Sequence, residues 1–447
     1  MSDREGIAAL WTKEDWWAVW LGLGIIACAI VFFVAGGTLR PLAVSPPRDW
    51  TVFSRVTSHF TENWIWYVLL YLVFGGVFTM STSVMGHKVK HYVPGFTLIF
   101  LVSVLILVVS QSQFFHYYSL EAPLVALILG LLVGNFARLP NWLDSSLRTE
   151  YYIKTGIVLL GATLPLTLII TAGPIAFLQA TIVSLCTWLA MFFFATRVFG
   201  LDKRFGAVLG AGGAVCGVSA SIAVGGAVKA DKEHVAISIS IVSLWALVMI
   251  FFLPLASKAL GLHPGVAGAW IGTSEFADAA GYAAAQTIAS NAGNEAAIQT
   301  FTLMKVIGRD IWIGIWAFVL SIISVTMWEQ GSNTVGSTVG VGVIWARFPK
   351  FVIGFFLASV IMSILVASSS ADYAAEITPR LITPIKTLRT WTFVFTFLCI
   401  GLTTRFRDLA KFGMPPFWAF TVGVLVNVPL GYFLSTVVFS DYWMAVQ

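Results

Sequence analysis

Four charged side chains stand on two neighbouring apolar segments, where charges are rare. Glu275 and Asp278 lie three residues apart in one segment, and Lys305 and Arg309 lie four apart in the next. Such spacings put both members of a pair on one face of a helix, whereas Asp310, next to Arg309, points elsewhere on a regular helix. Because buried charges need partners, we expect the two acids to pair with the two cations.

These four charges suit transport chemistry. Ionisable groups inside apolar spans mark ion and proton pathways, and a planar guanidinium matches the parallel oxygens of an oxyanion. In this interpretation Lys305 and Arg309 attract an anion, while Glu275 or Asp278 carries a coupling proton or helps to bind sodium. Two simpler interpretations stay open: the acids are solvated at a membrane edge, or the charges form a structural ion-pair network.

A run of small residues precedes the charged segments. Residues 208–229 are rich in Gly, Ala and Ser, which form a poor helix. The run either packs closely against another helix or is a discontinuous helix whose backbone groups face a substrate. The second interpretation makes binding residues of Cys216, Gly217, Ser219 and Ser221.

A second break is predicted just before the acids. Thr273 and Ser274 precede Glu275 and are residue types that begin helices well. The start of a half-helix carries partial positive charge and unpaired N–H groups, so it attracts anions. We therefore expect an anion to lie between the two breaks.

The elements that must position these residues are transmembrane helices. Of 447 residues, 58% are hydrophobic and 11% are charged, far from the charged content of a soluble protein. About 20 apolar residues span a bilayer, and thirteen candidate spans follow on this basis: 16–36, 63–85, 93–111, 119–137, 151–171, 173–197, 206–228, 233–260, 265–288, 296–326, 347–368, 383–404 and 414–438. The fold class predicted is an all-α polytopic membrane protein.

The charges between the spans predict an orientation. The formal net charge is +5, and if all thirteen spans cross, roughly twice as many Lys and Arg lie on the side of the N-terminus as on the other. Positive loops stay in the cytoplasm, so we expect a multi-pass protein of the bacterial inner membrane with a cytoplasmic N-terminus. Lys and Arg lie in short loops, so no nucleic-acid surface is expected.

An internal repeat divides the chain. Gly161, Thr163, Gly173, Phe177 and Thr181 recur as glycine, threonine or phenylalanine at a constant offset of 240. An odd number of spans separates the copies, which predicts inverted repeats, as in secondary transporters. The expected parts are a cytoplasmic tail at 1–15, a three-span extension at 16–111, a first transporter half at 119–328, a Gly/Ser-rich linker at 329–346 and a C-terminal membrane part at 347–447.

Signatures of soluble enzymes are absent from the sequence. There is no Walker A, HExxH or GxSxG motif, and no histidine pair has the spacing of metal ligands. We therefore expect no enzyme, no metal centre and no cofactor apart from Na⁺ or H⁺ as a coupling ion. The expected partners are a small anion, the lipid bilayer and a second copy of the chain in a homo-oligomer.

Several segments together resemble a known family. They are LILGLLVGN at 127–135, GIVLLGATL at 156–164, GAGGAVCGVSAS at 210–221, EHVAISISIV at 233–242, GTS at 272–274 and LMKVIGR at 303–309. Over about residues 119–438 the chain resembles the bacterial YeiH-like family of proposed sulfate exporters.

The resemblance implies a fold similar to bile-acid symporters and sodium/proton antiporters, with a panel domain and a core domain whose discontinuous helices cross at the site. It puts Cys216, Gly217 and Ser219 in one such helix, and Thr273 and Ser274 in the other. Where the family has a His-acid pair after GTS, this chain departs from the pattern and has an acid, two apolar residues and a second acid.

The function predicted is secondary transport of a small oxyanion, such as sulfate or an organosulfonate, by a proton- or sodium-coupled exporter. Two alternatives remain: a cation/proton antiporter in which the acids are the site, and a membrane subunit or sensor that transports nothing.

Overall fold

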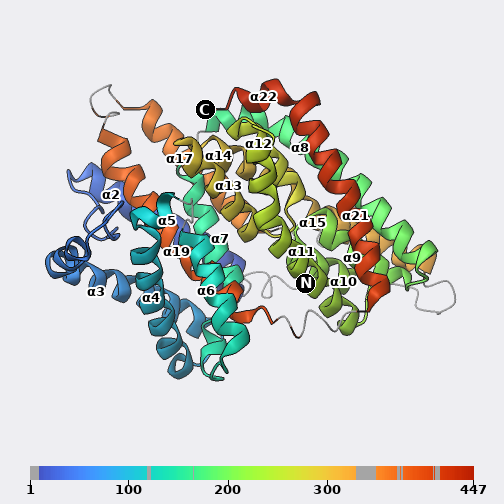
Figure 1. Ribbon diagram of the computed structural model, residues 1–447, viewed down its shortest axis with the longest axis horizontal. Helices are drawn as coiled ribbons and strands as arrows, with labels where there is room; N and C mark the ends of the chain where they lie inside the picture. Colours follow the sequence, from blue (N-terminus) through green and yellow to red (C-terminus); the bar gives the residue numbers. More distant parts are fainter. Residues whose placement is uncertain are drawn as a thin grey trace. The chain divides into compact units, whose positions relative to one another are not determined.

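A computed structural model describes the chain over residues 10–117, 122–164, 166–328, 349–369, 373, 376–405, 407 and 413–446 (Figure 1). Over this part of the chain the architecture is helical, with an isolated β-bridge between Trp50 and Ser112. Among the described residues, eight helices are long and apolar enough to cross a membrane. Each of the thirteen predicted spans overlaps one or more helices, so the protein is a multi-pass helical membrane protein.

The helices form two compact units, each built from two stretches of chain. The first comprises Met1–Thr167 with Lys350–Arg405, and the second Leu168–Pro349 with Phe406–Gln447. These units group the helices differently from the segments predicted in chain order. The predicted linker at 329–346 lies outside the described residues, and the predicted tail at 1–15 overlaps the start of the first helix at Glu14.

The first unit holds the N-terminal helices. Its elements are α2 (Glu14–Val34), α3 (Phe53–Val84), α4 (Val89–Ser110), α5 (Gln113–Tyr117), α6 (Ala122–Phe136), η1 (Leu143–Ser145), α7 (Thr149–Gly161), α17 (Phe351–Ala367), η5 (Thr378–Ile382) and α19 (Thr383–Thr403). Gly130 and Gly134 of α6 lie directly on the backbone of α19 at Gly401, where a Cβ would leave no room. This four-residue spacing of glycines is a known route to close helix packing in membranes.

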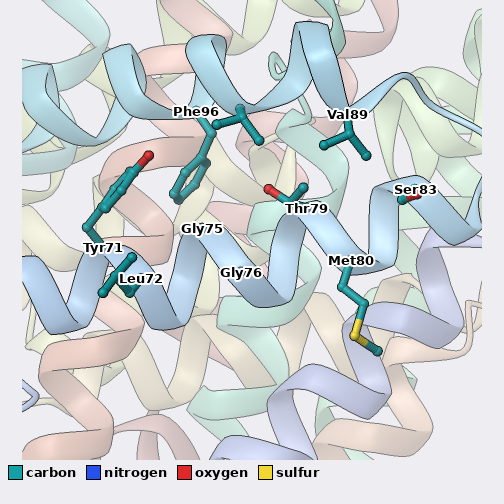
Figure 2. A pocket seen from close by; sticks show the side chains of 10 residues that line it. Tyr71, Leu72, Gly75, Gly76, Thr79, Met80, Ser83, Val89 and Phe96 are labelled. Carbon is teal, nitrogen blue, oxygen red and sulfur yellow. The ribbon is translucent and has the colours of Figure 1, made fainter.

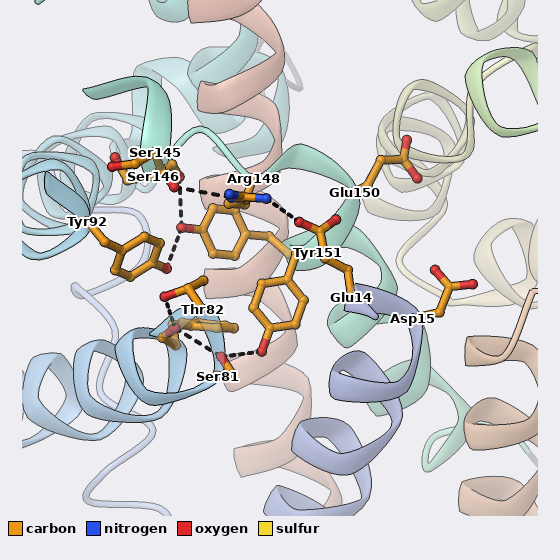
Figure 3. A network of polar contacts seen from close by, with 12 residues as sticks. Glu14, Asp15, Ser81, Thr82, Tyr92, Ser145, Ser146, Arg148, Glu150 and Tyr151 are labelled. Atoms are coloured by element: carbon orange, nitrogen blue, oxygen red, sulfur yellow. Dashed lines mark hydrogen bonds and ion pairs between the residues drawn. The ribbon is translucent and has the colours of Figure 1, made fainter. Parts of the chain in front are cut away.

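Polar contacts join the N-terminal helices to α7. The Arg148 guanidinium donates to the Glu14 carboxylate of α2 at 2.6 Å, and the Tyr151 hydroxyl donates to Ser81 of α3 at 2.6 Å (Figure 3). Between α3 and α4 runs a mostly apolar groove of about 440 Å³ (Figure 2). The predicted three-span extension is therefore packed on the rest of this unit.

The second unit holds both predicted breaks. Its elements are α8 (Leu166–Phe193), η2 (Phe194–Val198), α9 (Lys203–Ala214), α10 (Gly217–Ala227), α11 (Lys232–Ala259), α12 (Pro264–Ser274), α13 (Asp278–Ala292), α14 (Ala296–Thr302), η3 (Leu303–Arg309), α15 (Trp312–Ile323), η4 (Ser324–Trp328), α21 (Met414–Phe433), η6 (Leu434–Val438) and α22 (Ser440–Met444). Two residues separate α9 from α10, and three separate α12 from α13. Both breaks are confirmed, but the prediction that Thr273 and Ser274 begin a half-helix is wrong: they end α12, and the next half-helix begins at Asp278.

The chain turns back at the first break. The Arg204 guanidinium, at the start of α9, donates to the Lys229 carbonyl just after α10 at 3.3 Å. Nearer the break, Gly212 lies against Ser221. Later residues of α9 thus contact earlier residues of α10, so these two helices, the legs of a hairpin, run antiparallel. We call α9, the turn at 215–216 and α10 hairpin 1.

The second break is also a turn. Gly268 of α12 lies against Ala297, and Gly272 lies against Met304 and the Phe301 carbonyl. Later residues of α12 thus contact later residues of α14 and η3, so α12 runs parallel to them. Asp278 contacts Lys305, whereas Gly281 lies against Phe301, so α13 runs antiparallel to them. We call α12, the turn at 275–277 and α13 hairpin 2.

The hairpins enter from opposite ends of the rod formed by α14, η3 and α15. The open end of hairpin 2 lies at the start of α14, whereas the Ser324 hydroxyl beyond α15 donates to the Val228 carbonyl at the open end of hairpin 1. The prediction that 206–228 and 265–288 each cross the membrane is therefore wrong: each returns to the side it came from. The two reversals cancel, so the predicted sides of all later spans are unchanged.

The predicted repeat has a structural counterpart in α8 and α21. Gln179 donates to Ser435 at 2.7 Å, and Asn427 donates to Thr187 at 3.0 Å. The later residue of α8 in these two contacts pairs with the earlier residue of the second segment, so α8 and α21 run antiparallel. Thr187 and Asn427 are also the equivalent positions of the 240-residue repeat, and equivalent residues touch where a twofold axis passes. The inverted relation of these two helices is confirmed.

Candidate functional site

The tips of the two hairpins touch each other in the middle of the second unit. The Gly217 amide, the first of α10, donates to the Phe276 carbonyl in the turn of hairpin 2 at 2.8 Å. A Cβ on Gly217 would lie 2.9 Å from that carbonyl oxygen and 2.3 Å from Val242. Glycine is therefore needed where the two backbones meet, and the predicted role of this residue at the break is structural.

A buried ion pair lies beside the contact between the tips. The Lys305 ammonium is 3.3 Å from the Asp278 carboxylate, with exposed side-chain fractions of 0% and 10%. The same ammonium donates to the Val215 carbonyl of hairpin 1 at 2.8 Å. The Cys216 thiol donates to Asp278 at 3.1 Å. The predicted pairing of an acid with a cation is confirmed here, and both hairpins share it.

Arg309 has a different environment from the one predicted. It is completely buried, and its guanidinium donates to five backbone carbonyls, those of Gly213, Ala214, Gly272, Thr273 and Glu275. These carbonyls lie at the C-terminal ends of α9 and α12, where helices have unpaired acceptors and partial negative charge. The cation neutralises both ends at once and joins the two hairpins.

Glu275 caps the turn of its own hairpin. One carboxylate oxygen accepts from the Phe276 amide at 2.8 Å and the Ala277 amide at 3.2 Å. The other oxygen has no hydrogen-bond partner within the described residues, although the residue is fully buried. The alternative that the acids are solvated at a membrane edge is therefore wrong for Glu275.

Asp310 belongs to the site, contrary to the prediction that it points elsewhere. Residues 303–309 form a π turn, and the Asp310 amide donates to the Lys305 carbonyl at 2.9 Å. On an α-helix, residues five apart are separated by about 140° around the axis, but a π turn pairs residue i with i+5. Ligand atoms of Cys216, Asp278 and Asp310 lie within 4.8 Å of one another, so this trio has the donor types for a cation.

The hydroxyl residues divide between the site and the surroundings. Ser219 lies in the first turn of α10 and is half-buried, and the Ser274 hydroxyl at the end of α12 is buried without a hydrogen-bond partner in the described chain. The Thr273 hydroxyl donates within its own helix, to Trp270 at 2.9 Å. Ser221 is hydrogen-bonded to Ser238 of α11 at 3.0 Å, away from the tips.

The arrangement brings two half-helix N-termini, of α10 and α13, to one buried ion pair. Val218, Ser219, Ala277 and Asp278 are the half-buried residues at these ends, so this edge of the site is open. Sequence reasoning missed Asp310 and the carbonyls of Val215 and Phe276. The π turn brings Asp310 to the site, whereas the two carbonyls belong to the backbone and carry no side-chain signal.

Comparisons with known proteins agree with this membrane architecture. The family described as Conserved hypothetical protein 698 matches residues 94–419. A UPF0324 membrane protein of Rhodopirellula baltica is 31% identical over 415 residues, which are 90% of this chain and 73% of that protein. One of Nitrosomonas europaea is 30% identical over 90% of both chains, and one of Nitratidesulfovibrio vulgaris is 32% identical over 83% of this chain and 64% of that protein. No solved structure matches significantly.

Proposed function

This chain belongs to the Conserved hypothetical protein 698 family, the YeiH-like UPF0324 membrane proteins, and on that premise we propose that it is a secondary transporter. Its cargo in this proposal is a small oxyanion such as sulfate or an organosulfonate, exported across the bacterial inner membrane with the N-terminus in the cytoplasm. The observation that carries the proposal is the buried pair of Lys305 and Asp278 between two opposed hairpin tips.

The anion would bind where α10 and α13 begin. The helix dipoles favour negative charge there, and the Lys305 ammonium supplies a full positive charge. Half-helix N-termini that point at an anionic substrate are the usual arrangement in transporters with interrupted helices. Ser219, in the first turn of α10, adds a hydroxyl at the open edge.

Asp278 would couple the anion to a proton. As a carboxylate it already neutralises Lys305 at 3.3 Å, so it competes with a second anion for the same ammonium. Protonation of Asp278 removes its charge and leaves the ammonium to the substrate. Binding of the anion should therefore strengthen as the pH falls, so anion and proton would cross in the same direction, and export would be driven by the anion's own outward gradient. Sodium held by Asp278 and Asp310 would have the same effect.

Arg309 would act as a positioning residue in this mechanism. Its guanidinium is engaged by carbonyls of both hairpins, so Lys305 is the cation that meets the anion. Glu275 would hold the turn of hairpin 2 through the two amides that it accepts from.

The test is sulfate flux in proteoliposomes at several pH values. Lys305→Gln should lower flux at least tenfold, whereas Lys258→Gln, an exposed lysine at the end of α11, should leave it unchanged. Asp278→Asn should keep sulfate exchange but abolish its dependence on a pH gradient, and the exposed Asp231→Asn serves as its control. Unchanged flux in folded Lys305→Gln protein would refute the anion site.

A cation/proton antiporter is the second candidate, favoured by the ligand atoms of Cys216, Asp278 and Asp310 within 4.8 Å of one another. In that case Asp278→Asn and Asp310→Asn should each abolish sodium-dependent proton movement, and sulfate should have no effect. Sodium-dependent proton movement, measured with a pH-sensitive dye inside the same vesicles, decides between the candidates.

A further inference from the structure

A charged pocket lies at the open end of hairpin 1, far from the tips. It has a volume of about 270 Å³ and is lined by Asp202, Lys203, Arg204, Lys229, Asp231 and Trp328. These residues come from three segments: the start of α9, the connection from α10 to α11, and the end of η4. The pocket is thus formed by both legs of hairpin 1 and by the far end of the α14–α15 rod.

The three cations of this pocket outweigh its two acids. Asp202 is the N-cap of α9, and its carboxylate accepts from the amides of Arg204 at 2.9 Å and Phe205 at 3.2 Å. The side chain of Asp231 is 83% exposed and lies 3.9 Å from the imidazole of His234. The side chains that line the pocket therefore carry a net formal charge of about +1, which favours an anionic ligand.

The backbone holds the cations in place. Lys229 has a φ of 54°, a left-handed conformation that residues with a Cβ seldom adopt. The Arg204 guanidinium donates to the carbonyl of this lysine at 3.3 Å, which closes the open end of the hairpin. Trp328 stacks on Phe192 with 6.0 Å between the ring centroids, so one wall is an anchored indole.

The depth of the pocket follows from the length of the hairpin. α9 has 12 residues and so extends about 18 Å from the tip, whereas half of the hydrocarbon core is about 15 Å. With the tips near the bilayer centre, the open end of hairpin 1 falls at the level of the lipid phosphates. Tryptophan is enriched at this level, as Trp328 illustrates.

We infer that this pocket binds a phosphate group, that of an anionic lipid headgroup, through Lys203, Arg204 and Lys229. Basic pockets between membrane helices hold such headgroups, and a guanidinium pairs with two phosphate oxygens at once. The headgroup would join the two legs of hairpin 1 from outside. This site is separate from the proposed transport site and does not depend on it.

The experiment titrates the purified full-length protein in neutral detergent with short-chain phosphatidylglycerol, and in parallel with inorganic phosphate and phosphatidylcholine. Binding is read from the shift in thermal unfolding. Arg204→Gln and Lys229→Gly should each weaken phosphatidylglycerol binding about fivefold, the effect of one lost cation near a surface. Lys229→Gly suits the test because glycine adopts the left-handed conformation freely.

Lys232→Gln is the matched control, since this exposed lysine begins α11 beside the pocket without lining it. Unchanged binding in both pocket variants, or an equal loss in Lys232→Gln, overturns the site. Binding of inorganic phosphate as tight as that of phosphatidylglycerol keeps a phosphate site but overturns the lipid as its occupant. Equal binding of phosphatidylcholine overturns the role of net charge.

Discussion

Arg309→Ala should destabilise the protein more than other single changes near the site. The guanidinium is 0% exposed and donates to five carbonyls at the ends of α9 and α12. Each buried acceptor left unsatisfied costs about 1–3 kcal/mol, but the helix ends relax and share the loss. We expect a decrease in the free energy of unfolding of about 3–5 kcal/mol, similar to breaking a buried ion pair.

Arg309→Lys should lower the free energy of unfolding by less, about 2 kcal/mol, because an ammonium keeps the charge but has only three hydrogen-bond donors. The free energy of unfolding is measured by denaturant titration in detergent micelles with tryptophan fluorescence. Arg197→Ala, at an exposed position in η2, is the control and should change stability by less than about 0.5 kcal/mol. If Arg309→Ala unfolds within about 1 kcal/mol of the native protein and loses only sulfate binding, the capping role is refuted and Arg309 is a substrate ligand.

Three further outcomes follow from the packing. Gly217→Ala should lower both sulfate flux and stability, by about 1–3 kcal/mol, because its Cβ would lie 2.3 Å from Val242; normal flux would contradict the contact between the tips. Gly265→Ala should destabilise by a similar amount in the same titration, since its Cβ would meet the Trp443 carbonyl at 2.0 Å, whereas Gly24→Ala, with nothing within 4 Å, should be neutral or stabilising. Trp443→Phe should lower the free energy of unfolding by about 1–2 kcal/mol, because the hydrogen bond to Gln179 is lost. A variant as stable as the native protein would show that this hydrogen bond does not hold α22 in place.

Much of the site could be found in the sequence because its signals are local. Membrane residence follows from hydropathy, which is a property of each segment by itself. The first break was predicted from a run of Gly and small residues that form a poor helix, and the second from the polar residues Thr273 and Ser274. Glu275, Asp278, Lys305 and Arg309 were candidates because charges inside apolar segments are costly and need a reason.

Other features depend on contacts between distant residues. A Gly-rich break looks the same in a helix that continues and in one that turns back, and only contacts such as Arg204 with Lys229 decide between them. The role of Arg309 also depends on where its donors end, at the carbonyls of two helices about 35 and 95 residues away.

The sequence by itself determined that this is a multi-pass membrane protein and marked Glu275, Asp278, Lys305 and Arg309 as charges inside apolar segments, because both follow from the cost of placing one segment in lipid. Tertiary structure decided that 206–228 and 265–288 are hairpins that enter from opposite ends, and that the π turn brings Asp310 to the site. Helix direction and backbone hydrogen-bond register are chosen by packing between segments, and no local pattern of residues encodes them.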